Sequence, residues 1–390
     1  MKINKIEISE FKALRNVILE PGNVNVLIGA NGTGKSTFLE AVGLLSLAMT
    51  DRLDDLALSR KGIRLSTPSL YKTNLEKFKV NPQIGLALEW DDDASYRYDV
   101  HFNPPIDKSY WRYGAEVLTR DGAHVWGRSN RSAEITDDSV GLLMLDLDED
   151  LVNVRTQVSC LKKYAIYQPV TPILRGTLPD PIQIAPIGLS GGRLAEAIAD
   201  LIREENGEIL FGDMDMDELL EMIDWADSIS ITSPNKSNIN ANVPATRRVI
   251  EFRDRYMKQS KRFTAYDASE GALYVLFLMC LALHPDTPDI FAIDNFDQAM
   301  NPRLAKEITG RFCNEIIKRG KTVFLTTHNP LVLDGLDLTD ERIRLFETDR
   351  DENGHIIMNR IRVSEELIST GQSLSRLWIN GYLGGVPELI

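Results

Sequence analysis

Short, nearly continuous apolar runs mark three buried strands along the chain. They span 24–28, 289–294 and 324–328, and strands covered on both faces in a parallel sheet have this pattern. Two longer apolar stretches, at 37–47 and 272–283, have the length of helices. Strands and helices that alternate in this way predict an α/β fold with a mainly parallel core sheet.

A second pattern, in which apolar and polar residues alternate, occurs at 96–102 and 116–126. A period of two is typical of antiparallel strands that are buried on one face, so we expect an antiparallel β-layer beside the core sheet. We interpret 185–262 as helices of an inserted lobe. The chain is therefore divided into a first lobe with the antiparallel layer, an inserted helical lobe and the rest of the core: residues 1–180, 181–265 and 266–390.

Between the first strand and the first helix lies the sequence Gly-Ala-Asn-Gly-Thr-Gly-Lys-Ser, residues 29–36. The spacing is that of a phosphate-binding loop. Its glycines let backbone N–H groups surround the β-phosphate, Lys35 reaches the β- and γ-oxygens, and the Ser36 hydroxyl binds magnesium. An ordinary glycine-rich turn is the alternative, and the flanking strand and helix argue against it. The residues expected to bind ATP and Mg²⁺ here are Asn31, Gly32, Thr33, Gly34, Lys35, Ser36 and Thr37.

Two further strands end in residues suited to the same chemistry. The run 289–294 ends at Asp294, and a carboxylate at the carboxyl end of a buried strand is the position of a Walker B aspartate, which helps to hold magnesium. The strand at 324–328 ends at His328, one strand-helix-strand unit further along the chain. We interpret His328 as a hydrogen-bond partner of the γ-phosphate.

Two segments compete for the role of the ABC signature motif. Leu189-Ser190-Gly191-Gly192 matches the transporter signature in letters but lies far upstream of Asp294, whereas Ser269-Glu270-Gly271 opens the helix that leads directly into the Walker B strand. A signature belongs at the second position. We therefore expect Ser269 and the N–H groups after it to meet a γ-phosphate held by another subunit. The segment 189–192 is interpreted as a turn that caps a helix at 193–202.

Taken together, these motifs resemble those of the ABC-type ATPases of the SMC/RecF clan, in particular the compact group that includes the ATPase halves of OLD nucleases. Residues 2–12 are similar to the first strand of this group, and 377–385 to its C-terminal segment. The resemblance implies a P-loop NTPase of ABC type that forms a homodimer, or a higher oligomer, around ATP–Mg²⁺. It also implies a glutamine that links magnesium to subunit movement, for which Gln168 is the candidate and Gln157 the alternative. The residues that would act across the dimer are Ser269, Glu270, Gly271 and Asn301.

One position departs from the pattern of the clan. The residue after the Walker B aspartate is normally a glutamate that polarises the attacking water, and here it is Asn295. An amide can orient a water but cannot act as a general base, whose loss lowers a rate by about 10²–10⁴-fold. Asp297 lies two residues further on as a substitute. The sequence thus predicts a weakly hydrolysing, nucleotide-gated switch, with a catalytic centre made of Lys35, Asp294, Asn295, Asp297 and His328.

Composition excludes some classes of protein. The 390 residues, of which 43% are hydrophobic, suffice for one large or two ordinary domains. No apolar run reaches the roughly 18–20 residues that span a bilayer, and the N-terminus lacks the apolar core of a signal peptide. We expect a cytoplasmic protein without membrane contact. The three widely spaced cysteines argue against a disulfide framework or a zinc site.

The charge of the chain limits the partners that it can bind. The formal net charge of −13 opposes general binding to nucleic acid. The basic stretch at 247–262 nevertheless offers a local contact for DNA, RNA or an acidic partner, and its alternative interpretation is a solvated helix face.

The resemblance leads to two functional hypotheses. The first is a sensor ATPase of a bacterial anti-phage system, similar to those of Septu and PARIS, that controls a separate effector nuclease. No nuclease motif is found in the chain, since Asp349-Arg350-Asp351 matches a DxD pair in letters only. The second is a DNA-binding clamp of RecF type in DNA repair. An ABC transporter ATPase is a weaker third hypothesis, because the signature and the β-rich insertion differ from that class.

Overall fold

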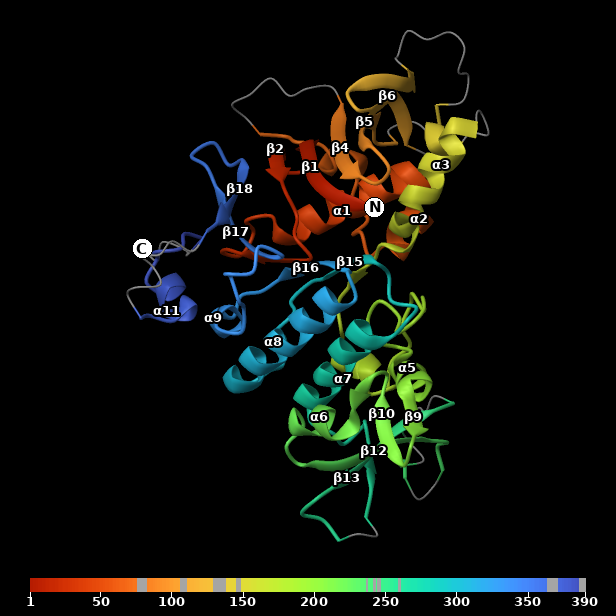
Figure 1. Ribbon diagram of the computed structural model, residues 1–390, viewed down its shortest axis with the longest axis vertical. Helices are drawn as coiled ribbons and strands as arrows, with labels where there is room; N and C mark the ends of the chain where they lie inside the picture. The colour runs from red at the N-terminus through yellow and green to blue at the C-terminus, as the bar shows by residue number, and fades with distance from the viewer. Residues whose placement is uncertain are drawn as a thin grey trace.

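A computed structural model of the chain describes ten stretches of residues: 1–75, 83–105, 111–128, 138–144, 149–235, 238–240, 243, 247–258, 261–362 and 371–385. Figure 1 shows an elongated molecule with an antiparallel sheet at one end and the strands β12 (Ala226–Thr232) and β13 (Val249–Asp254) at the other. Helices α7 (Glu270–Leu283) and α8 (Pro302–Lys318) lie between these ends. Within the described stretches no helix is long and apolar enough to cross a membrane.

The core sheet has six strands in the order β18-β17-β3-β16-β15-β8. Their bounds are Ile356–Ile361, Ile343–Arg350, Val24–Ile28, Thr322–Thr326, Ile290–Ile293 and Ile166–Tyr167. All neighbours pair in parallel except β18, which is antiparallel to β17. Every residue of β3 and β15 is buried, as their continuous apolar runs predict. The mainly parallel core sheet is thus confirmed, and the carboxyl ends of its strands meet at one edge.

A second six-stranded sheet, in the order β2-β1-β4-β5-β6-β7, is antiparallel throughout. Its strands are Leu14–Leu19, Lys2–Phe11, Ile84–Asp91, Ser95–Asn103, Arg112–Arg120 and Ala123–Arg128. Burial alternates along β5, with Tyr98 and Val100 inside and Arg97 more exposed. The alternating sequence pattern therefore predicted the antiparallel layer correctly.

Helix α1 (Lys35–Thr50) lies between the two sheets. Fourteen of its sixteen residues are buried, and they share one hydrophobic core with the antiparallel sheet and with residues of the core sheet such as Leu27 and Phe324. The Phe38 and Phe324 rings meet edge to face at 5.6 Å. This packing fixes the start of α1, and with it the preceding loop, against the ends of the core strands. The shorter helices near this layer are α2 (Asp55–Arg60) and α3 (Glu149–Val158).

The opposite face of the core sheet is covered by helices. The most buried is α7 (Glu270–Leu283), in which every residue from Ala272 onward is buried because the helix packs between the sheet, α8 and the inserted lobe. A helix that is apolar on all sides requires such surroundings. The other helices of this layer are α4 (Thr171–Leu174), α8 (Pro302–Lys318), α9 (Pro330–Leu333) and α11 (Leu374–Ile379).

The inserted lobe differs from the expected set of helices. It contains α5 (Leu194–Leu201) and α6 (Met216–Glu221) but also two three-stranded antiparallel sheets. Their strands are β9 (Ile202–Glu205), β10 (Glu208–Phe211), β11 (Met214–Asp215), β12 (Ala226–Thr232), β13 (Val249–Asp254) and β14 (Phe263–Thr264).

The reason for this difference is visible in local sequence signals. Asn206 and Gly207, both at positive φ, form the two-residue turn between β9 and β10, and Asn-Gly is the strongest short hairpin signal. Isoleucines at alternate positions mark β12. The prediction of a purely helical lobe was therefore wrong, although the helix expected at 193–202 is present as α5.

Candidate nucleotide-binding site

The loop 29–36 connects β3 to α1, as predicted. Gly29, Gly32 and Gly34 have φ values of 149°, 79° and 89°, which other residues adopt only with strain. A Cβ at Gly34 would collide with the Ile356 side chain, and one at Gly29 with the backbone of Thr348. The loop is therefore held tightly against β17 and β18, with its backbone available to a ligand.

Lys35 is buried at the start of α1. Its Nζ donates hydrogen bonds to the carbonyl oxygens of Gly29 at 2.8 Å and Ala30 at 2.9 Å. Burial lowers the pKa of Lys35 to about 8, although the nearby Asp294 carboxylate opposes the shift. A buried ammonium with only carbonyl partners is electrostatically unsatisfied, and an anionic phosphate would supply the missing charge.

The Ser36 hydroxyl and the Asp294 carboxylate, here called the oxygen pair, meet where the loop approaches the end of β15. The Ser36 hydroxyl donates to Asp294 Oδ1 at 3.0 Å, and the Thr326 hydroxyl donates to the same oxygen at 2.5 Å. Hydroxyl and carboxylate oxygens are ligands that suit Mg²⁺, which also takes ligands from phosphates. The pair therefore fits the implied metal, which Ser36 and Asp294 would hold and which would neutralise phosphate charge.

The two candidate glutamines lie in different places. Gln168 follows β8 and lines a cavity of about 120 Å³ together with Ser36 and Asp294. Gln157, on α3, instead accepts a hydrogen bond from Trp90 Nε1 and donates one to Asp93. Only Gln168 is near the oxygen pair.

A larger cavity of about 390 Å³ collects most of the predicted ligand-binding residues. Its lining includes Asn31, Gly32, Gly34, Lys35, Ser36, Thr37, Asp294 and His328. Thr33 is an exception, since its hydroxyl donates to Ala30 O and bonds the Thr348 hydroxyl. Its side chain therefore stabilises the loop by contacts with the loop itself and with β17, and it does not line the cavity.

Three cations in this cavity were missed in the sequence: Lys12, Arg64 and Arg350. Lys12 and Arg64 both pair with Glu40, at 2.5 and 2.6 Å, and Arg350 donates to Gly32 O. Glu40 is a buried carboxylate in a largely apolar helix, and this could have signalled that cations lie nearby. Nothing local identifies which cations these are, because they come from distant segments.

His328 lies at the carboxyl edge of the sheet and lines the cavity, with its side chain exposed to solvent. Partial desolvation in the cavity wall, reinforced by Lys35, lowers its pKa, while Asp297 and Asp294 oppose the shift. The ring is therefore neutral at pH 7, with one N–H to donate and one nitrogen to accept.

Asn295 and Asp297 do not line this cavity. Asn295 has a φ of 57°, and its N–H donates to the Thr326 hydroxyl at 2.9 Å. Asp297 Oδ1 accepts a hydrogen bond from the Thr327 hydroxyl at 2.6 Å. Asparagine adopts left-handed backbone more readily than glutamate does, which is a structural reason for an amide here.

The signature residues gather at a separate hollow of about 700 Å³. Ser269, Gly271 and Asn301 line it, and Glu270 is exposed beside it. Ser269 caps α7 by accepting from Ala272 N at 3.4 Å, and Asn301 caps α8 by accepting from Leu304 N at 3.0 Å. The chain thus keeps these residues apart from the cavity of Lys35 and Asp294.

Comparison with known proteins agrees with this arrangement. Residues 1–85 match a family model described as an AAA ATPase domain, and 194–334 match one described as an AAA domain, putative AbiEii toxin, Type IV TA system. An SMC head bound to the C-winged helix domain of ScpA has a TM-score of 0.52 at 11% identity, covering 93% of this chain and 99% of that one. Two parts of the chain thus match models of ATPase domains, and the fold is that of an SMC head, as the resemblance to ABC-type ATPases of the SMC/RecF clan predicts.

A second solved structure has the same fold. It is an Smc head domain with an extended coiled coil bound to the C-terminal domain of ScpA, derived from Pyrococcus furiosus. Its TM-score is 0.52 at 10% identity, covering 95% of this chain and 98% of that one. None of the curated proteins compared with the chain matches it.

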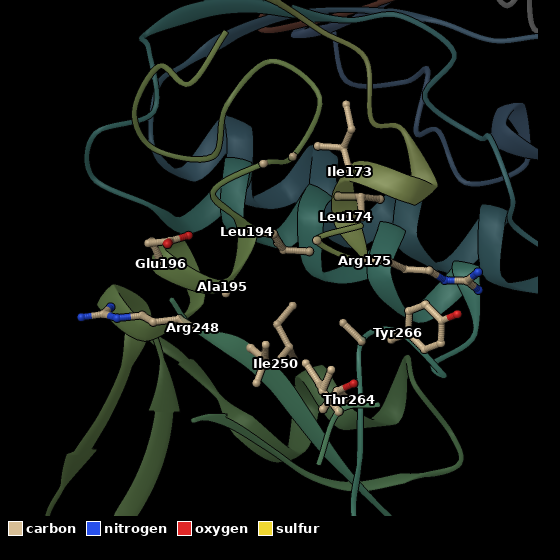
Figure 2. Close-up of a pocket in the computed structure, with 16 residues that line it drawn as sticks. Ile173, Leu174, Arg175, Leu194, Ala195, Glu196, Arg248, Ile250, Thr264 and Tyr266 are labelled. Atoms are coloured by element: carbon tan, nitrogen blue, oxygen red, sulfur yellow. The ribbon is translucent and has the colours of Figure 1, made fainter. Parts of the chain in front are cut away.

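The segment Leu189–Gly192 is a turn before α5, as expected. It lies beside the end of β8, since Gln168 N donates to Leu189 O at 2.9 Å. Figure 2 shows the cavity on its other side, where Arg175 extends past Leu174 above Tyr266. Arg175 donates to Ala268 O, next to the signature serine. A continuous set of contacts thus runs from Gln168 to Ser269.

The basic stretch at 247–262 is not a helix face. It comprises β13 and the following turn toward β14, with residues 259–260 outside the described part. Arg253 pairs with Asp227, Arg255 donates to Ala226 O, and Arg262 lies 3.7 Å from Glu251. Several of its cations therefore stabilise the lobe itself.

Proposed function

We propose that this ATPase is the nucleotide-gated regulatory subunit of a bacterial anti-phage defence system and controls a separate effector nuclease. The observation that carries the proposal is the contrast between Lys35 and Asn295. The cavity of Lys35 has four cations and an oxygen pair for phosphate and magnesium. The position of the general base, however, holds an amide in left-handed backbone. Such a site favours holding ATP over hydrolysing it.

The active form in this proposal is a homodimer that encloses two ATP–Mg²⁺. Lys35, Ser36, Asp294 and His328 of one copy would hold each nucleotide, and Ser269 of the other copy would close it. The separation of the two sets into different cavities supports this arrangement. The capped amino end of α7 suits a γ-phosphate, because helix amino ends attract anions.

The defence context rests on the family description that names the AbiEii toxin for residues 194–334. The two SMC heads of similar fold are each bound to a domain of ScpA, and this supports regulation through a protein partner that docks on the same fold. Membership of the OLD-like group and the identity of the effector remain predictions.

The proposal that this protein hydrolyses ATP slowly is tested by placing a glutamate at position 295. Asn295→Glu should raise phosphate release at least about tenfold, because it restores a general base, and left-handed backbone would cost the variant only about 1 kcal/mol. Asn295→Gln, equal in length but uncharged, is the matched control and should not gain activity. Mass in solution, followed with ATP–Mg²⁺, should show a dimer in each case. Fast wild-type hydrolysis that Asn295→Glu leaves unchanged would contradict the proposal and indicate Asp297 as the base.

The rival function is a RecF-like DNA clamp, which the SMC-head fold favours. Lys258 and Lys261 are exposed at the β13–β14 turn and available for such binding. DNA affinity of the purified protein, with and without ATP, separates the two functions. Tight binding that is lost in the double variant Lys258→Glu, Lys261→Glu would favour the clamp. Arg253 and Arg255 are unsuitable for reversal, since they support the lobe.

The defence role is tested in cells that carry the gene with its natural neighbours. The efficiency with which phage forms plaques should be lower on these cells, and Lys35→Met should remove the protection. Protection that persists in this variant would show that nucleotide binding does not control the response.

A further inference from the structure

The transporter-like motif Leu189–Gly192 is left without a role by the proposed function, yet it borders the magnesium side of the nucleotide site. The cavity of about 120 Å³ has Ser36 and Asp294 in its lining, together with Gln168 and Ser190. A cavity of this size holds several waters when its walls are polar. Ser190 is thus the one hydroxyl that the motif brings to the wall of the cavity containing the metal-binding oxygen pair.

The turn is fixed by contacts that leave the Ser190 side chain unused. Asp180 is buried, and its Oδ2 accepts from Ser190 N at 3.0 Å and from Gly192 N at 3.1 Å. Ser190 O accepts from Val170 N at 3.2 Å. A Cβ at Gly192 would collide with Asp180. The backbone therefore holds the turn in place, and the half-buried Ser190 hydroxyl has no hydrogen-bond partner within the described part of the chain.

We infer that Ser190 is a positioning residue for magnesium: its hydroxyl would hold a water of the metal's coordination shell in the cavity that Ser36 and Asp294 also line. Mg²⁺ gives up its waters reluctantly and usually keeps several. A serine hydroxyl can donate to one neighbour and accept from another, which suits a water wedged between a metal and the protein. The inference rests on the proposed function, because it requires nucleotide and metal in this site.

The position of Ser190 also ties the metal to the rest of the turn. Gln168 and Val170 donate to the carbonyl oxygens of Leu189 and Ser190, so the turn runs alongside the segment after β8. A shift of that segment on nucleotide binding would move Ser190 and Gln168 together. The motif thus serves the magnesium of its own chain, and not the nucleotide of a partner.

The test is the magnesium dependence of nucleotide affinity in the full-length protein. A fluorescent ATP analogue is titrated in EDTA and at increasing Mg²⁺ for wild type, Ser190→Ala and the control Ser228→Ala, which removes a hydroxyl from β12 in the lobe. Melting temperatures check the fold. Ser190→Ala should need about tenfold more Mg²⁺ for half of the affinity gain, with unchanged affinity in EDTA. Ser228→Ala should match wild type in both.

The outcomes are distinct. An unchanged magnesium requirement in Ser190→Ala would overturn the inference and leave the proposed function intact. Equal losses with and without Mg²⁺ would also overturn it, since they would assign Ser190 a general structural role. Failure of the wild type to bind nucleotide at all would overturn both the proposed function and the inference.

Discussion

The nucleotide cavity and the signature hollow use the same chain in opposite ways. The first is lined by Lys12, Lys35, Arg64 and Arg350 and by an oxygen pair. The second is lined by two helix caps and by side chains of both charges, such as Glu221, Asp224, Glu307, Arg303 and Arg311. In the proposed function the first cavity binds phosphate and metal, whereas the second offers helix amino ends. Each would then supply what the other lacks, as two halves of one site do.

A second comparison concerns two buried lysines, of which one lines the nucleotide cavity and the other does not. Lys35 and Lys61 are both buried and both donate to two main-chain carbonyl oxygens. Only Lys35 lines the nucleotide cavity. Burial lowers the pKa of both, to about 8 for Lys35 and about 7 for Lys61. The pKa alone therefore does not distinguish the two lysines, whereas the position of Lys35 in the cavity does.

We expect the greatest loss of function from a change in the nucleotide cavity. Lys35→Met should weaken ATP binding by roughly 1,000-fold, because it removes charge-assisted hydrogen bonds worth about 1.5–3 kcal/mol each. Lys61→Met is the matched control and should bind ATP as wild type does. A fluorescent nucleotide titration measures both. Equal binding by Lys35→Met and wild type would remove the cavity from consideration as the ATP site.

A smaller effect is expected at the signature hollow. Ser269→Asp keeps a good helix cap but adds a negative charge where a γ-phosphate would dock, so association driven by ATP should weaken about 100-fold. Binding of nucleotide to one chain should change less than twofold. The isosteric, uncharged Ser269→Asn is the control and should associate normally. Analytical ultracentrifugation with and without ATP measures this, and unaltered association of the aspartate variant would separate the hollow from the dimer contact.

The smallest effect concerns Lys61, outside both cavities. Its pKa in the folded protein, about 7, is below the usual lysine value of 10.5, so between these pH values the unfolded chain binds more protons than the folded one. The free energy of unfolding should therefore rise with pH, by about 1 kcal/mol between pH 7 and 8. In Lys61→Met this contribution should be absent. Urea unfolding of both proteins at the two pH values measures it, and identical pH dependence would contradict the assignment.

The local motifs were predictable because their chemistry lies in neighbouring residues. A strand, glycines at fixed intervals and Lys35 at the start of a helix define the phosphate loop, and folding adds only its position. The same is true of Asp294 at the end of β15 and of Ser269 as the cap of α7. Periodicity likewise predicted the parallel core and the antiparallel layer, since burial on one face or two leaves a direct pattern in the sequence.

The inserted lobe shows where such patterns were misjudged. Its short strands were predicted as helices although Asn206-Gly207 marked a hairpin. With strands of two to seven residues, the period is too short to separate one structure from the other, and turn chemistry carries most of the information.

A phosphate-loop motif, a strand that ends before Asp294 and an amide, and a helix that starts after Ser269 can all be recognised in the sequence. Folding was needed to bring Lys12, Arg64 and Arg350 beside Lys35, to place Ser190 in one cavity with Ser36 and Asp294, and to put Ser269 in a separate hollow. The cause is distance along the chain. Residues that lie far apart in sequence meet through packing of whole elements, and no local pattern records which of them will meet.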